Sequence, residues 1–238
     1  MSPVELALAF AVVVLAATLA GSIGFGQNLV AAPILALIEP ATVPAVLLLL
    51  ALPITILVVI RERETVDLRE VRWLIVGRVP GVVVGVFAVT ALSQDGLGLV
   101  LGLSILLVAL TTALGVSIPR TTATKLGGGF VSGFGGTTVG IGGPTVAILY
   151  ADVGGPRLRA TMAAYLLAGA LMSIGALAVA GHLGRTELEL SLPLIPAVLL
   201  GYLASSRVAP MLDRGYTRPV VIGVSVVSAL IVLARSLA

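Results

Sequence analysis

Two long stretches of the sequence, 41–60 and 97–119, contain no charged residue at all. A helix that spans the hydrocarbon core of a bilayer needs about 20 mostly apolar residues. Charged residues make up only 11% of the chain, whereas a typical soluble domain carries roughly 25%. Most of the surface must therefore face something other than water. We predict an all-α integral membrane protein.

The scarcity of cysteine and histidine excludes disulfides and several kinds of metal site. The chain has no cysteine, so it has neither disulfides nor thiolate metal sites, and His182 is its single histidine. The net charge is +3, but the basic residues sit in short clusters between apolar runs, as in the loops of a multi-pass membrane protein. We therefore predict no nucleic-acid partner, no metal and no cofactor.

Charges and prolines divide the chain into ten apolar segments. They span 3–23, 28–38, 41–60, 72–92, 97–117, 124–138, 143–151, 157–181, 188–207 and 218–237. At about 1.5 Å per helical residue, the second and seventh segments cover roughly half a bilayer. The others are long enough to cross, the sixth only marginally.

Glycine and proline landmarks recur in the same order, four of them at one spacing and Gly102 at a spacing of 121, as Gly223. The four are Gly24, Gly26, Pro80 and Gly85, which return 116 positions later as Gly140, Gly142, Pro196 and Gly201. We therefore predict one membrane domain made of two repeats, 1–119 and 120–238. Each half is expected to be a re-entrant or broken-helix hairpin followed by three transmembrane helices.

Loop arginines predict opposite topologies for the two halves. Basic clusters lie at 61–72, 120–125, 157–159 and 207–218, and the positive-inside rule places all four in the cytoplasm. The loops at 39–40, 93–96 and 182–187 then fall outside. Inverted repeats of this kind are typical of secondary transporters, whose site lies near the midplane at the repeat interface.

Two glycine-rich breaks, GSIGFGQN at 21–28 and GGTTVGIGGP at 135–144, form the predicted hairpin tips. Irregular backbone inside a bilayer is tolerated only where it is buried in protein or lines a cavity. Asn28 is the expected N-cap of the following half-helix, and Pro144 suits the first turn of the other. The free N–H groups at two such helix starts favour an anion.

The candidate anion site consists of the polar residues and glycines of the two breaks. These are Gly24, Gly26, Gln27, Asn28, Thr137, Thr138, Gly140, Gly142, Gly143 and Pro144. The alternative is that the glycines serve only close helix packing. Arg78, inside the segment 72–92, has two interpretations that remain open: a counter-charge to the anion, or an arginine that extends to the membrane surface.

Function classes other than transport find less support in the sequence. No HExxH metal pair and no GxSxG serine motif with partners is present, so we predict no enzyme and no catalytic residue. A secondary transporter for small anions is favoured. An anion channel of the same fold and a transporter of a different small organic anion remain as alternatives.

Three stretches resemble the TauE/SafE family of sulfite and organosulfonate exporters. They read VDLREVRWLIVGRVPGVVVG, GFGGTTVGIGGPTVAILY and LGRTELELSLPLIPAVLLGYLASSRVAP. The first break differs from the family pattern, which usually has a run of glycines where this chain has Gln27 and Asn28. The resemblance implies a multi-pass protein of a prokaryotic cell membrane that exports a small sulfur-containing anion. Expected partners are that anion and the lipid bilayer, and we allow for a homodimer.

Overall fold

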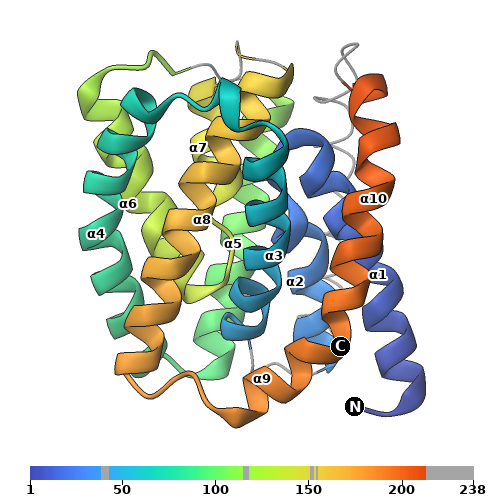
Figure 1. Ribbon diagram of the computed structural model, residues 1–238. Coiled ribbons are helices and arrows are strands. Elements are labelled where there is room, and N and C mark those ends of the chain that lie inside the picture. Colours follow the sequence, from blue (N-terminus) through green and yellow to red (C-terminus); the bar gives the residue numbers. More distant parts are fainter. Residues whose placement is uncertain (39–42, 115–117, 151–152, 154, 213–238) are drawn as a thin grey trace.

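Helices make up most of the computed structural model, which describes residues 1–38, 43–114, 118–150, 153 and 155–212 (Figure 1). The α-helices are α1 (Pro3–Ile23), α2 (Gln27–Ile38), α3 (Ala45–Arg61), α4 (Leu68–Ala91), α5 (Gln94–Ala113), α6 (Thr122–Thr138), α7 (Gly143–Ala147), α8 (Gly155–Val179), α9 (Arg185–Ser191) and α10 (Ile195–Met211). Short 3₁₀ helices are η2 (Arg63–Thr65), η3 (Ile148–Tyr150) and η4 (Leu192–Leu194). The described residues contain no strand, which confirms the all-α prediction.

Helix positions follow the apolar segments closely. Each of the first nine predicted segments coincides with a helix or with consecutive helices, whereas 218–237 and the loop at 39–40 lie outside the described residues. Within the described part, four stretches are long and apolar enough to cross a membrane: α1, α4, α8 and the run Arg185–Met211. The predicted crossing by α3 is less clear, because this helix has 17 residues and a span needs about 20.

The ends of α1 show why this segment folds as predicted. Ser2 caps the first turn by accepting a hydrogen bond from the Glu5 amide, while the Glu5 carboxylate accepts one from the Ser2 amide. The helix ends at Gly24, which has a left-handed backbone with φ of 89°. Gly140, within the break after α6, has a similar φ of 77°. Glycine adopts this conformation without the steric cost that other residues incur.

Helices from the first half of the chain pack against helices from the second half. The fourth helix of the first half, α4, runs along α6, and α10 runs along α1. Gly81 lies so close to the Phe130 carbonyl of α6 that a Cβ atom would overlap it, and a Cβ at Gly201 would come within 2.6 Å of the Val14 carbonyl of α1. Between these pairs, α3 lies beside α8. Small residues thus allow the close backbone contacts that membrane helix pairs require.

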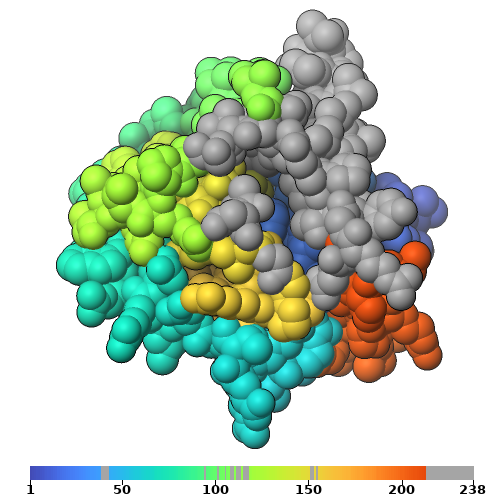
Figure 2. Space-filling view, turned by 90° about the horizontal axis from the view of Figure 1, so that it is seen from above, coloured from blue at the N-terminus to red at the C-terminus, as the bar shows by residue number. Residues whose placement is uncertain are grey.

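Basic loops gather at one end of the bundle. Ion pairs join the start of α4 and its preceding loop to the starts of α6 and α8; they are Lys125–Glu70, Arg157–Asp67 and Arg159–Glu62. Figure 2 views this end and shows the segments around residues 60–70, 120–130 and 150–160 on one face. The N-terminus and α9 lie at the opposite end (Figure 1). We call the first the arginine-rich end.

Apolar side chains cover the outside of the bundle as well as its core. On α4, Val76, Val83 and Phe87 are exposed, Phe87 by 69%. On α5, Leu99 and Leu103 are exposed too. Monomeric soluble proteins rarely expose contiguous apolar surface on this scale, so the outer faces of α4 and α5 fit a lipid environment.

Candidate functional site

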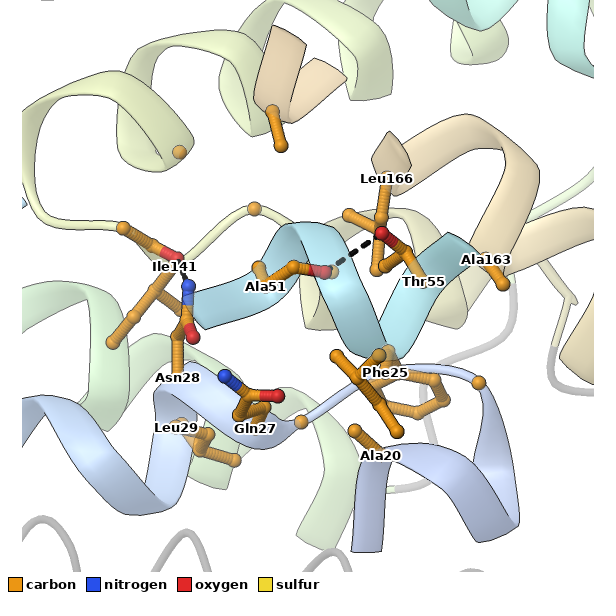
Figure 3. Close-up of a pocket in the computed structure, with 18 of the residues that line it drawn as sticks. Ala20, Phe25, Gln27, Asn28, Leu29, Ala51, Thr55, Ile141, Ala163 and Leu166 are labelled. Atoms are coloured by element: carbon orange, nitrogen blue, oxygen red, sulfur yellow. Dashed lines mark hydrogen bonds between the residues drawn. The ribbon is translucent and has the colours of Figure 1, made fainter. Parts of the chain in front are cut away.

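The two glycine-rich breaks touch one another. The side-chain amide of Asn28, at the start of α2, donates a hydrogen bond of 2.8 Å to the Gly140 carbonyl. These residues are 112 positions apart in the sequence. Figure 3 shows Gln27 and Asn28 extending from the same turn, with Asn28 directed toward the second break. The chain thus brings both predicted tips to one place.

Local geometry at the two breaks departs from the expected symmetry. Asn28 is not the N-cap, because α2 already begins at Gln27, after the left-handed Gly26. The N-cap prediction for Asn28 is therefore wrong. Pro144 does lie in the first turn of its helix, as predicted, but α7 has only five residues. Of the two helix starts whose free N–H groups were predicted to favour an anion, the main one is therefore that of the twelve-residue α2.

A cavity of about 60 Å³ lies between the breaks. One water-sized group needs roughly 10–15 Å³ on this scale, so the cavity has room for about four to six. Its polar lining consists of Gln27, Asn28, Thr55 and Arg78, and backbone from both breaks adds Gly24, Gly26, Gly140, Gly142, Gly143 and Pro144. Apolar side chains of α3 and α8 complete it, including Ala51, Ala163 and Leu166 (Figure 3).

Arg78 is the charged residue among those that line the cavity. It lies near the middle of α4 and is only 2% exposed. Its Nη1 donates to the Ser132 hydroxyl at 3.0 Å and to the Tyr165 hydroxyl at 3.1 Å, and the guanidinium lies 5.2 Å from the centre of the Tyr165 ring. Ser132 in turn donates to the Gly142 carbonyl at 2.8 Å. The guanidinium is therefore held inside the bundle and does not extend to its surface.

Glycines from two other helices make room for this guanidinium. A Cβ atom at Gly136 of α6 would come within 2.6 Å of Nη2 of Arg78, and one at Gly169 of α8 would overlap its Cζ. A Cβ at Gly142 would lie 3.4 Å from Nη1. The close packing of α4, α6 and α8 thus encloses the Arg78 side chain. Residues larger than glycine at these positions would displace it.

The charge of Arg78 has no acidic partner among the described residues: its contacts are two neutral hydroxyls and an aromatic ring. A guanidinium stays protonated in proteins. A buried charge is costly unless it is paired, and intramembrane arginines mark ligand pathways or pair with other groups. Within the described residues, no negative charge therefore balances the guanidinium beside the cavity.

Several polar atoms beside the cavity lack hydrogen-bond partners among the described residues. They are Nε2 and Oε1 of Gln27, Oδ1 of Asn28 and Nε of Arg78, all buried. Buried polar atoms in proteins are nearly always satisfied by protein or water. Water would satisfy these atoms individually, but it would not balance the Arg78 charge.

Nearly the whole chain matches the model of one known protein family. The family model of the sulfite exporter TauE/SafE matches residues 9–232, nearly the whole chain. The chain belongs to the TauE/SafE family. This is a family of membrane transporters, so the cavity described here lies in a transport protein of the membrane. No curated protein and no solved structure gives a match to the chain.

Two residues of the predicted site lie outside the cavity in this TauE/SafE chain. The Thr137 hydroxyl is 2.8 Å from the Ser173 hydroxyl of α8, and Thr138 donates to the Phe134 carbonyl of its own helix. Both threonines are buried, and neither lines the cavity. Because α6 remains helical through Thr138, the second break begins only after them.

Sequence reasoning did not single out three groups around the TauE/SafE cavity. Thr55 lines the cavity, whereas Ser132 and Gly169 contact the Arg78 guanidinium beside it. A weak signal exists for Ser132, which is a hydroxyl inside an apolar segment. Nothing in the sequence distinguishes Gly169 from neighbouring small residues, because its role depends on α4 of the other half.

Proposed function

We propose that this protein exports small sulfur-containing anions, sulfite above all, and holds the anion in the cavity between the two glycine-rich breaks. The observation that carries the proposal is Arg78. It is a permanent, buried cation at mid-helix that borders the cavity and has no carboxylate beside it among the described residues. A bound anion would supply the missing charge.

Donors and acceptors in the cavity suggest how a ligand is oriented. The Arg78 guanidinium and the Gln27 Nε2 are donors suited to oxyanion oxygens. In the orientation described, the Gln27 Oε1 and Asn28 Oδ1 are acceptors that no donor of the described part of the chain reaches, so they favour a ligand that also carries a proton. Hydrogensulfite has both kinds of group. The first N–H groups of α2 add the positive end of its dipole.

Cavity size favours sulfite over larger sulfonates in this conformation. Space for about four to six water-sized groups accommodates the one sulfur and three oxygens of sulfite. Organosulfonates add a carbon chain, for which the cavity would have to open. We therefore place sulfite first and organosulfonates second.

Alternating access is the second part of the proposal. We propose that the two halves are inverted repeats, and the packing of α4 on α6 and of α10 on α1 supports this relation. We also propose a prokaryotic cell membrane as the location, with the arginine-rich end in the cytoplasm. An anion channel is the competing function. It is disfavoured because the cavity is bounded by buried apolar side chains, Leu48 and Ala170, toward the end that carries α9.

Flux measurements in proteoliposomes test the proposed function. Wild-type protein should move labelled sulfite with saturation, and Arg78→Gln should abolish that flux while inserting normally. Arg157→Gln is the matched control, because this arginine is 63% exposed in a surface ion pair with Asp67; it should transport like wild type. Non-saturating flux would favour a channel, and undiminished flux in Arg78→Gln would remove Arg78 from the site.

A further inference from the structure

Two hydroxyl groups from different helices hold one end of the Arg78 guanidinium. The Tyr165 hydroxyl of α8 and the Ser132 hydroxyl of α6 both accept hydrogen bonds from Nη1, at 3.1 and 3.0 Å. A guanidinium carries five N–H donors in one plane, two of them on Nη1. The two hydrogen bonds therefore use both donors of Nη1, and three donors remain, one on Nε and two on Nη2.

The remaining donors of Arg78 meet no acceptor in the described part of the chain. Nε is buried and has no hydrogen-bond partner there, and both hydrogen bonds of this side chain leave from Nη1. Nε and Nη2 each direct one N–H bond to the same side of the guanidinium, and such parallel bonds suit two oxygens of one oxyanion. We call this side of Arg78 the Nε–Nη2 edge.

Neighbouring glycines show how the guanidinium is oriented relative to the cavity. A Cβ atom at Gly169 would overlap Cζ, Nε and Nη1 together, so this glycine lies against the flat face of the guanidinium and not beside the Nε–Nη2 edge. A Cβ atom at Gly136, a residue that lines the cavity, would come closest to Nη2. Ser132 and Tyr165 do not line the cavity. The two hydroxyls thus hold Nη1 from behind, whereas Nη2 lies on the cavity side.

We infer that Tyr165 and Ser132 are positioning residues that make the cavity select oxyanions over halides. By fixing Nη1, they present the Nε–Nη2 edge to the ligand, and this edge donates to two oxygens of one anion at once. A halide is a single atom, so two parallel N–H bonds cannot both point straight at it. The inference deepens the proposed function and rests on it, because it requires that the anion binds at Arg78.

Competition between bromide and sulfite tests the inference with Tyr165→Phe. This substitution removes the hydroxyl and keeps the aromatic ring, whose centre lies 5.2 Å from Cζ of Arg78. A mildly acidic buffer keeps most of the sulfite as the monoanion hydrogensulfite, so that both competitors carry one negative charge. The readout is the bromide-to-sulfite concentration ratio that displaces half of the labelled sulfite from purified protein.

Tyr165→Phe should make bromide a better competitor. Without the Tyr165 hydroxyl, the guanidinium can rotate, and the Nε–Nη2 edge is no longer fixed. Sulfite then loses about one charge-assisted hydrogen bond, so its affinity should fall roughly tenfold, whereas bromide keeps most of its affinity. The bromide-to-sulfite ratio should therefore fall roughly tenfold as well. A purely structural role for Tyr165 would weaken both anions alike, and an unchanged ratio overturns the inference.

Tyr150→Phe is the matched control for the loss of a buried tyrosine hydroxyl. The Tyr150 hydroxyl donates to Oε2 of Glu70 at 2.9 Å, and Tyr150 does not line the cavity. Its bromide-to-sulfite ratio should equal that of wild type. If Tyr165→Phe does not fold, Ser132→Ala removes the other acceptor of Nη1 and should lower the ratio too. An unchanged ratio in folded Ser132→Ala contradicts the inference.

Arg78→Gln separates a failure of this inference from a failure of the proposed function. If Arg78 holds the anion, Arg78→Gln loses sulfite binding, and a wild-type ratio in Tyr165→Phe then overturns the inference alone. If Arg78→Gln binds sulfite like wild type, the proposed site is wrong, and the selectivity inference is wrong with it.

Discussion

Asn28 donates a hydrogen bond to the backbone carbonyl of Gly140, and this bond joins the glycine-rich breaks of the two halves of the chain. The carbonyl belongs to a residue with φ of 77°, a conformation that glycine adopts freely. A side chain from one break thus fixes the backbone of the other, and the cavity lies between them.

Asn28→Ala should therefore loosen the junction. It removes a hydrogen bond worth about 0.5–1.5 kcal/mol, so the melting temperature in detergent should fall and sulfite flux should fall with it. Thr138→Val is the control, because that hydroxyl only contacts the Phe134 carbonyl of its own helix; its flux should match wild type. If Asn28→Ala transports normally, the junction is not needed for function.

Arg78→Lys should show that geometry matters as well as charge. Lysine keeps one positive charge but lacks the planar fork that arginine offers to oxyanions. Loss of one charge-assisted hydrogen bond, worth about 1.5–3 kcal/mol, should raise the KM for sulfite roughly tenfold or more. The flux of correctly inserted protein measures this, and an unchanged KM would argue against direct contact between Arg78 and the anion.

Gly169→Ala should disturb Arg78 without touching the anion. A Cβ atom at this position would overlap the guanidinium, whereas one at Gly175, on the same helix, meets nothing within 4 Å. Gly169→Ala should therefore lower sulfite affinity, and Gly175→Ala should leave it unchanged. Both substitutions raise helix propensity equally, so a difference between their binding isotherms reports on the guanidinium. Identical isotherms would contradict the role of Gly169 in making room for the guanidinium.

Single-cysteine labelling should map the two ends of the bundle. The chain has no native cysteine, so each introduced thiol reports alone. Glu64→Cys and Arg157→Cys should react with an impermeant reagent from the cytoplasmic side, and Ser93→Cys and Thr186→Cys from the outside. All four positions are exposed. Labelling of Glu64→Cys and Thr186→Cys from the same side would refute the proposed topology.

Helix boundaries and the positions of the breaks were largely predictable from the sequence, for clear physical reasons. Apolar length limits each helix, and the segment 3–23 coincides with α1 because a Ser2–Glu5 capping box starts it and Gly24 ends it. The prediction that the two breaks meet in space also follows from the repeat spacing, and the Asn28–Gly140 contact agrees with it.

Side-chain roles depended on contacts between distant helices, and the sequence left them open. Arg78 had two interpretations because its burial is decided by Gly136 and Gly169, on helices of the other half. Thr137 and Thr138 appeared to belong to the break, but α6 stays helical through both and directs them elsewhere. Arg159 read as an ordinary loop charge, yet it is nearly buried beside Glu62.

Anomalous diffraction from crystals of wild-type protein with selenite tests the central claim most directly. Selenite is the heavier analogue of sulfite, and a chain without cysteine has no thiol to react with it. We predict a selenium peak in the cavity between Gln27 and Arg78, with a selenite oxygen about 2.7–2.9 Å from a guanidinium nitrogen. Selenium bound elsewhere, with this cavity empty at saturating selenite, would contradict it.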